Sequence, residues 1–148
     1  MNRTTTVKPG DIQPKWHVVD ATNIPVGRLA AQVAQVIRGK HKVNFAYNAD
    51  CGDFVIIINA GKAVLTGRKA EELIYWHTMY PGGIRNVQRG TLLEENPVKL
   101  IEKAVWGMTP KTKLGHQIIK KLKVYAGDEH PHAAQNPTPL SIAKESTK

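Results

Sequence analysis

Phe54-Val55-Ile56-Ile57-Ile58-Asn59 is an uninterrupted apolar segment that ends in an asparagine. A strand with one solvated face would alternate apolar and polar residues, and this segment does not. Most of its residues are β-branched, and Gly52 and Gly61 lie on either side of it. Such a pattern is typical of a strand that is buried on both faces, as in a parallel sheet.

The chain before this segment predicts another strand and a helix. Trp16–Asp20 is expected to form a short strand. Pro25 suits the first turn of a helix, and Gly39 is placed to end one. Between them, apolar residues recur at three- and four-residue spacing, as in an amphipathic helix: Val26, Leu29, Ala30, Val33, Ala34 and Ile37. Strand, helix and buried strand together predict a βαβ unit in an α/β domain.

The chain after the segment predicts shorter elements. Residues 62–65 are expected to form a short strand, and residues 68–78 a helical turn and a further strand, before a loop at Pro81-Gly82-Gly83. Asn96 and Pro97 predict the cap and first residue of a second helix, which Gly107 ends. The apolar stripe of that helix is Val98, Ile101, Ala104 and Val105.

A third helix is predicted after Pro110, because Leu114, Ile118 and Leu122 share one helical face. Residues 123–125 are expected to form the last strand. No internal repeat divides the 148 residues, and their number suits one domain. The predicted organisation is an extended N-terminal arm over residues 1–15, an α/β domain over 16–126 and an extended C-terminal tail over 127–148.

The formal net charge of +9 indicates a polyanionic partner. Nucleic acid is the commonest such partner, although basic enzymes and membrane-surface proteins share the trait. No apolar run approaches the roughly 18 residues of a membrane helix, and no secretory signal is expected. With Cys51 as the one cysteine, an intrachain disulfide is impossible and a reducing compartment fits.

Two segments carry positive charge without acidic residues. Between Asp20 and Asp50 the cations are Arg28, Arg38, Lys40 and Lys42, and between Glu102 and Asp128 they are Lys103, Lys111, Lys113, Lys120, Lys121 and Lys123. On the third helix the predicted core face is Leu114, Ile118 and Leu122, and the predicted RNA face is Lys113, Lys120 and Lys121. An ordinary solvated face, or lysines that merely follow a helix end, are the alternatives.

Three other kinds of site are disfavoured by the pattern. The segment 61–69 resembles a nucleotide loop, but its glycines are separated by five residues and Arg68 stands where the lysine should be. His130-Pro131-His132 is an unconvincing metal site because alternate residues of an extended chain point apart. Cys51 lies between Asp50 and Asp53, which oppose thiolate formation. We therefore expect no catalytic residue, no bound metal and no cofactor.

Several short motifs, in this order, resemble the family of the thirteenth protein of the large ribosomal subunit in its bacterial form. They are Val26-Gly27-Arg28-Leu29-Ala30, Arg38-Gly39-Lys40-His41-Lys42, Asp50-Cys51-Gly52-Asp53-Phe54-Val55, Ile58-Asn59-Ala60, Thr66-Gly67-Arg68-Lys69, His77-Thr78, Tyr80-Pro81-Gly82-Gly83, Ala104-Val105, Gly107-Met108, Leu122-Lys123-Val124-Tyr125-Ala126-Gly127 and His130-Pro131-His132-Ala133-Ala134-Gln135. The chain departs from the family at Met79, usually glycine, Thr109, usually leucine, and His116, usually arginine.

The resemblance implies a three-layer α/β/α domain on a small, mostly parallel sheet. It implies a cytoplasmic, non-enzymatic protein that binds large-subunit ribosomal RNA early in assembly, beside neighbouring ribosomal proteins. Some bacterial relatives also bind their own messenger RNA, a role that does not follow from this sequence. A free-standing RNA-binding regulator and a small α/β enzyme with a basic substrate site are the alternatives.

Charge and resemblance together give the residues expected to contact RNA. They are Arg28, Arg38, Lys40, His41, Lys42, Arg68, Lys69, His77, Lys111, Lys113, His116, Lys120, Lys121, Lys123, His130, His132 and Gln135. The histidines and Gln135 can donate hydrogen bonds to phosphates, 2′-hydroxyls or base edges.

Overall fold

The framework of the fold is the predicted βαβ unit, which the computed structural model places within the described residues 7–142. Strand β1 spans Trp16–Asp20, helix α1 spans Val26–Arg38 and strand β2 spans Phe54–Ile58. The two strands are parallel, with Val18 opposite Ile56. All six apolar residues of the predicted stripe of α1 are buried, which confirms that helix.

The main sheet contains four strands in the order β5-β2-β1-β6, and every neighbouring pair is parallel. Strand β5 spans Leu122–Val124 and strand β6 spans Thr138–Pro139. Val55, Ile56 and Ile57 have no exposed surface. The prediction of a central strand buried on both faces is therefore confirmed, and so is the α/β class.

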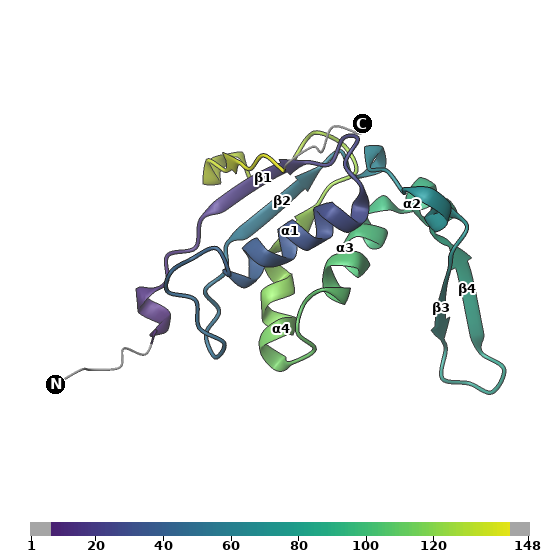
Figure 1. Ribbon diagram of the computed structural model, residues 1–148, viewed down its shortest axis with the longest axis horizontal. Helices are drawn as coiled ribbons and strands as arrows, with labels where there is room; N and C mark the ends of the chain where they lie inside the picture. The colour runs from purple at the N-terminus through teal and green to yellow at the C-terminus, as the bar shows by residue number, and fades with distance from the viewer. Residues whose placement is uncertain (1–6, 143–148) are drawn as a thin grey trace.

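One face of the sheet is covered by two helices that pack side by side (Figure 1). They are α1 and α3, which spans Pro97–Gly107. The core between them and the sheet contains Leu29 and Ile37 from α1 and Ile101 from α3, each fully buried. The predicted cap of α3 is confirmed, because the side chain of Asn96 accepts a hydrogen bond from the backbone N–H of Lys99 at 3.1 Å.

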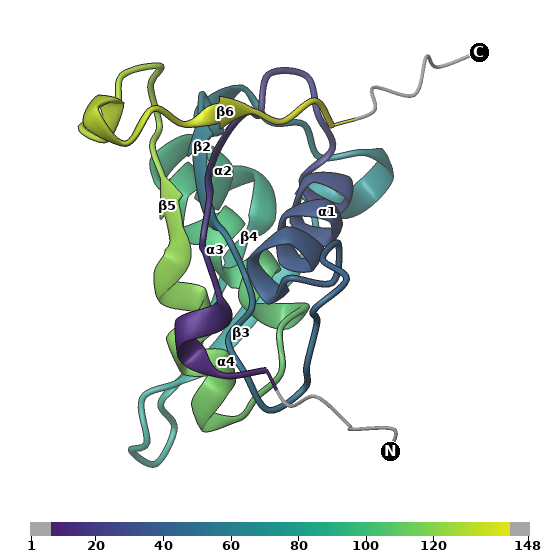
Figure 2. The same ribbon diagram turned by 90° about the vertical axis from the view of Figure 1, so that its left-hand side faces the viewer.

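The opposite face of the sheet carries Trp16 and Phe54, whose rings stack with their centroids 4.3 Å apart. His132 lies against Trp16 at 5.2 Å, so the returning C-terminal segment covers this face. That segment contains one 3-10 turn, η5 (Ala133–Gln135), which lies near β1 in Figure 1 and at the upper left in Figure 2. The third layer of the domain is consequently thin.

The C-terminal segment then joins the sheet, because β6 pairs with β1. Ile142, beyond it, is buried against the core. A short 3-10 turn, η1 (Pro9–Asp11), precedes β1 at the other end. Residues 1–6 of the predicted arm and 143–148 of the predicted tail lie outside the described part of the chain.

A two-stranded hairpin projects from the body of the domain (Figure 1). It consists of β3 (Leu73–His77) and β4 (Ile84–Gln88), which are antiparallel. The 3-10 turn η3 (Gly67–Ala70) precedes it and helix α2 (Arg89–Glu95) follows it. The helical turn and strand predicted within 68–78 are confirmed, whereas β4 and α2 were not predicted.

The short strand predicted over residues 62–65 is wrong. The chain forms a 3-10 turn, η2 (Ala60–Lys62), because the backbone N–H of Lys62 bonds to the carbonyl of Asn59 at 2.9 Å. Asn59 has a left-handed conformation with φ at 56°, which turns the chain immediately after β2. In this stretch of the described chain, strand pairing is limited to one isolated β-bridge between Pro25 and Val64.

The third predicted helix begins as expected but is shorter. Helix α4 spans Lys113–Ile118, a 3-10 turn, η4, spans Ile119–Lys121, and β5 then begins at Leu122. Leu122 is buried as predicted but belongs to the sheet, opposite Val55. In the part of the chain that the structure describes, no helix is long and apolar enough to span a membrane.

Candidate nucleic-acid interface

A basic groove runs along the outside of the domain between α3 and the segment from α4 to β5. Its volume is about 700 Å³, and the residues that line it are Lys99, Glu102, Lys103, Trp106, His116, Ile119, Lys120, Leu122 and Lys123. Four of these are lysines and one is a carboxylate. We refer to this set as the α3–α4 groove. It brings together three residues predicted to contact RNA, namely His116, Lys120 and Lys123.

Trp106 lines this groove and contacts the side chains of Lys111 and His116. The ammonium nitrogen of Lys111 is 3.8 Å from the centre of its ring. The imidazole of His116 packs against it with the ring centroids 4.6 Å apart. Lys111 also donates a hydrogen bond to the backbone carbonyl of Trp106. These contacts hold Lys111 and His116 in place at the surface, beside the groove lysines.

The sequence reasoning missed Lys99, Lys103 and Trp106 as site residues. They occur at positions i, i+4 and i+7 of α3, so one face of the helix presents all three. That spacing could have revealed a basic face on α3 matching the one on α4. What the sequence could not show is that the two helices place these faces on the same groove.

Lys121 does not lie on the predicted RNA face. Its ammonium group forms an ion pair with Asp50 at 2.8 Å and donates to the backbone carbonyl of Gly52 at 2.9 Å. It also lies 5.6 Å from the centre of the Phe54 ring. These contacts join η4 to the loop that precedes β2. Since the side chain of Lys121 is also only 13% exposed, it has a structural role.

A second internal cluster forms around Asp53, which is 1% exposed. Its carboxylate accepts hydrogen bonds from the ammonium of Lys42 at 2.5 Å and the backbone N–H of Lys15 at 2.8 Å. The imidazoles of His41 and His17 lie 2.8 and 3.4 Å from it. Burial by itself would raise the pKa of Asp53, but the contacts from Lys15, Lys42 and His41 hold that pKa below its ordinary value.

This cluster changes the prediction for the loop after α1. Lys42 is half-buried and neutralised by Asp53, so less of its charge is available to an external phosphate. His41 is 39% exposed, and Lys40 is exposed. The guanidinium of Arg38 lies 5.7 Å from the Phe45 ring and 5.4 Å from the Tyr47 ring, so it is also engaged within the protein.

The remaining predicted residues are spread over the surface and do not form one site. Arg28 is exposed on α1, Lys113 on α4, Gln135 on η5 and Arg68 and Lys69 on η3. His77, on β3, accepts a hydrogen bond from the backbone N–H of Met79 at 2.9 Å.

The two histidines of the C-terminal segment are engaged in the thin third layer. His132 lies 2.8 Å from the hydroxyl of Tyr125, and His130 accepts a hydrogen bond from the backbone N–H of His132 at 3.3 Å. Within the described residues, no three His, Cys, Asp or Glu side chains form a group that could hold a metal ion. Both histidines are therefore held by contacts within the protein.

Comparisons with known proteins identify the family of the chain. The family model described as Ribosomal protein L13 matches residues 14–131. The large ribosomal subunit protein uL13 of Thermobifida fusca is 53% identical over 143 residues, which cover 96% of each chain. The protein of that name from Renibacterium salmoninarum is 57% identical over 143 residues, which cover 96% of this chain and 97% of the relative. This chain belongs to the ribosomal protein L13 family.

Proposed function

We propose that this protein is a structural component of the large ribosomal subunit that binds ribosomal RNA through the α3–α4 groove. Its relatives are named as large-subunit ribosomal proteins, and they match it over nearly the whole chain. The L13 family consists of structural ribosomal components and not enzymes, so we assign this chain no reaction. As a ribosomal protein it is cytoplasmic.

The observation that carries the RNA-binding proposal is the concentration of lysines in one groove with little opposing charge. Lysines in such a groove neutralise phosphates and release the counterions that the RNA had held, which favours binding. The rigid sheet and the packed helices α1 and α3 fix the spacing of these lysines. The protein would therefore bind where two stretches of RNA backbone approach each other, and would stabilise that approach during early assembly.

Neighbouring ribosomal proteins are the second kind of partner in the proposal. A ribosomal protein that neutralises RNA on one side still presents its other faces to adjacent subunit components. The hairpin β3–β4 projects from the body of the domain (Figure 1), so it can reach such components. Binding to its own messenger RNA is not part of the proposal, because no contact in the groove distinguishes that RNA.

The test is equilibrium binding of the purified protein to large-subunit ribosomal RNA at fixed salt. The double variant Lys120→Glu with Lys123→Glu replaces two attractive charges in the groove with two repulsive ones. We expect its affinity to fall roughly tenfold or more. The matched control is Lys8→Glu with Lys62→Glu, which changes the net charge equally at exposed positions outside the groove.

Equal losses in both double variants would show that net charge alone determines binding, and the groove would then have no special role. Thermal melting of each variant establishes that the fold is retained. Sedimentation of a cell extract separates the proposal from the alternative of a free-standing RNA regulator. A subunit component should travel almost wholly with the large subunit, whereas a regulator should be found largely outside it.

A further inference from the structure

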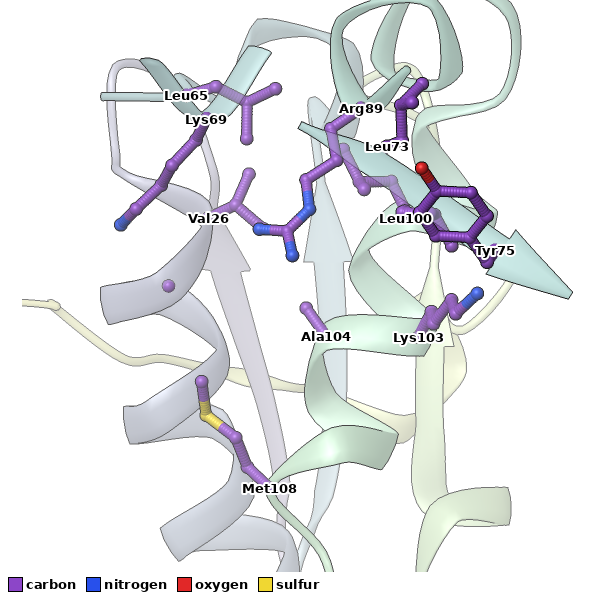
Figure 3. Close-up of a pocket in the computed structure, with 12 residues that line it drawn as sticks. Val26, Leu65, Lys69, Leu73, Tyr75, Arg89, Leu100, Lys103, Ala104 and Met108 are labelled. Atoms are coloured by element: carbon purple, nitrogen blue, oxygen red, sulfur yellow. The ribbon is translucent and has the colours of Figure 1, made fainter. Parts of the chain in front are cut away.

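A second hollow, which shares Lys103 with the α3–α4 groove, lies between the base of the β3–β4 hairpin, the first turn of α1 and the side of α3 (Figure 3). Its volume is about 520 Å³, within the usual range for sites that bind small molecules. Apolar side chains from three elements line it, among them Val26, Leu100 and Met108. We refer to this hollow as the hairpin cleft.

Cationic residues from different elements line the hairpin cleft. Lys69 comes from η3, Arg89 from the start of α2 and Lys103 from α3. Figure 3 shows the guanidinium of Arg89 inside the cleft, with Lys69 and Lys103 on opposite sides of it. Arg89 also pairs with Glu72 at 2.8 Å, but that contact uses one of its two terminal nitrogens. Among the described residues, none that lines the cleft is acidic.

The cleft also exposes apolar surface that a ligand would cover. Tyr75 is 57% exposed and Met108 is 47% exposed, although both line the hollow. Gly27, in the first turn of α1, leaves the backbone open because a Cβ there would meet nothing within 4 Å. The positive end of the helix dipole is therefore accessible beside the cations.

These features define the chemistry of the ligand. A purely apolar ligand would make no use of the positive charge of Lys69 and of the second terminal nitrogen of Arg89, and a bare phosphate would leave the apolar wall exposed to water. A flat, largely apolar group attached to an anionic group satisfies both parts. We propose that the hairpin cleft binds a single nucleotide, with its base against the apolar wall and its phosphate near Lys69 and Arg89.

The proposal rests on the proposed function, in that an unpaired residue of RNA is the nearest source of such a nucleotide. Stacking of a base on an aromatic ring is favourable for any base, so the cleft needs no particular sequence. A free nucleotide has the same chemistry. The experiment therefore includes both sources as separate arms.

The methionines of the chain provide the readout. There are three, and Met108 lines the cleft while Met79 is 88% exposed at the tip of the hairpin. In protein labelled with ¹³C at the methionine methyl groups, Met108→Leu assigns the relevant signal. We titrate this protein with adenosine monophosphate, with a short single-stranded oligoribonucleotide, with the same oligonucleotide as a duplex, and with an oligoglutamate peptide.

The Met108 signal should shift and saturate with the single strand and leave Met79 unmoved, and the duplex should have little effect. Lys69→Gln should weaken this binding roughly fivefold or more, because it removes one charged contact to the phosphate. Lys62→Gln removes the same charge at an exposed site outside the cleft and should change nothing. A saturable shift with the mononucleotide but not the single strand would keep the site and identify free nucleotide as its source.

Two outcomes would overturn the proposal. One is that the Met108 signal moves with neither nucleotide ligand while the protein still binds ribosomal RNA through the α3–α4 groove. In that case the proposed function stands and only the cleft assignment fails. The other is that the signal responds to oligoglutamate and to neither nucleotide ligand, which would make the cleft a docking site for an acidic protein segment.

Discussion

The ammonium nitrogen of Lys121 lies 2.8 Å from Oδ1 of Asp50 and joins the end of the η4 turn to the loop that precedes β2. The adjacent Lys120 is exposed and lines the α3–α4 groove. Two consecutive lysines, which the sequence presents as equivalent, therefore have different roles. Lys121 is engaged within the fold, whereas Lys120 is exposed to solvent.

Replacement of these lysines one at a time should separate the two roles. Lys121→Ala leaves the half-buried carboxylate of Asp50 without its partner, so it should lower the free energy of unfolding by about 1–3 kcal/mol. Lys120→Ala should change it by less than about 0.5 kcal/mol, since an exposed charge contributes little. Urea denaturation of both variants measures the difference. Equal effects on stability would contradict the structural role of Lys121.

Stability should depend on pH through Asp53. Its folded-state pKa is lowered from the ordinary 3.8, so the ionised carboxylate stabilises the fold above that pH. The stabilisation is lost as the pH falls below 3.8 and through the folded-state pKa. Asp53→Asn should therefore be less stable than the parent at pH 7, by about 1–3 kcal/mol for the lost charged contacts.

The difference between parent and Asp53→Asn should shrink as the pH is lowered below 3.8, because the parent then loses the same charge. Comparing the two proteins at each pH removes the contribution of every other carboxyl group. Unfolding curves at pH 7, 5 and 3 are sufficient. A difference that stays constant over this range would show that Asp53 contributes by its shape and not by its charge.

The elements that the sequence predicted correctly are those whose evidence is local. The stripe of α1 and the continuous apolar run of β2 each identify an element by its own periodicity. Leu122 misled the prediction because it lies four residues after Ile118, a spacing that fits one helix. The chain instead enters β5 there, since Leu122 pairs with Val55 in a strand far away in the sequence.

The candidate site was predicted less completely, because some of its contacts join residues that lie far apart in the sequence. Lys120 and Lys123 were found from the charge pattern and His116 through the family resemblance, but the role of Lys121 depends on Asp50, a partner from another part of the chain. The strand β4 was missed because Ile84 is 68% exposed and the strand has no buried face to impose an alternating pattern. Contacts between residues far apart in the sequence, such as that of Lys121 with Asp50, form only when the chain is folded.

Glycine at position 52 should be essential to the fold, because a Cβ there would lie 1.5 Å from the backbone carbonyl oxygen of Ile37. Backbone atoms of α1 cannot move aside as a flexible side chain could. Gly52→Ala should therefore cost at least about 1–3 kcal/mol. Gly107→Ala is the control, since a Cβ there meets nothing within 4 Å and alanine favours the last turn of α3. Thermal melting that shows equal effects would contradict this packing.

The salt dependence of RNA affinity should give the number of groove lysines that contact phosphates. Each neutralised phosphate contributes roughly 0.7 to 0.9 to the slope of log affinity against log salt. With Lys99, Lys103, Lys120 and Lys123 engaged, the groove should contribute a slope of about −3 to −4.

Lys120→Gln with Lys123→Gln should make that slope shallower by roughly 1.4 to 1.8, because two of the four contacts are removed. The same neutral substitutions at Lys8 and Lys62 should leave the slope unchanged, since these exposed residues lie outside the groove. Filter-binding titrations with large-subunit ribosomal RNA at several salt concentrations measure both slopes. If the groove variant has lower affinity but the parental slope, its lysines affect binding without neutralising phosphates, and the electrostatic role assigned to the groove is wrong.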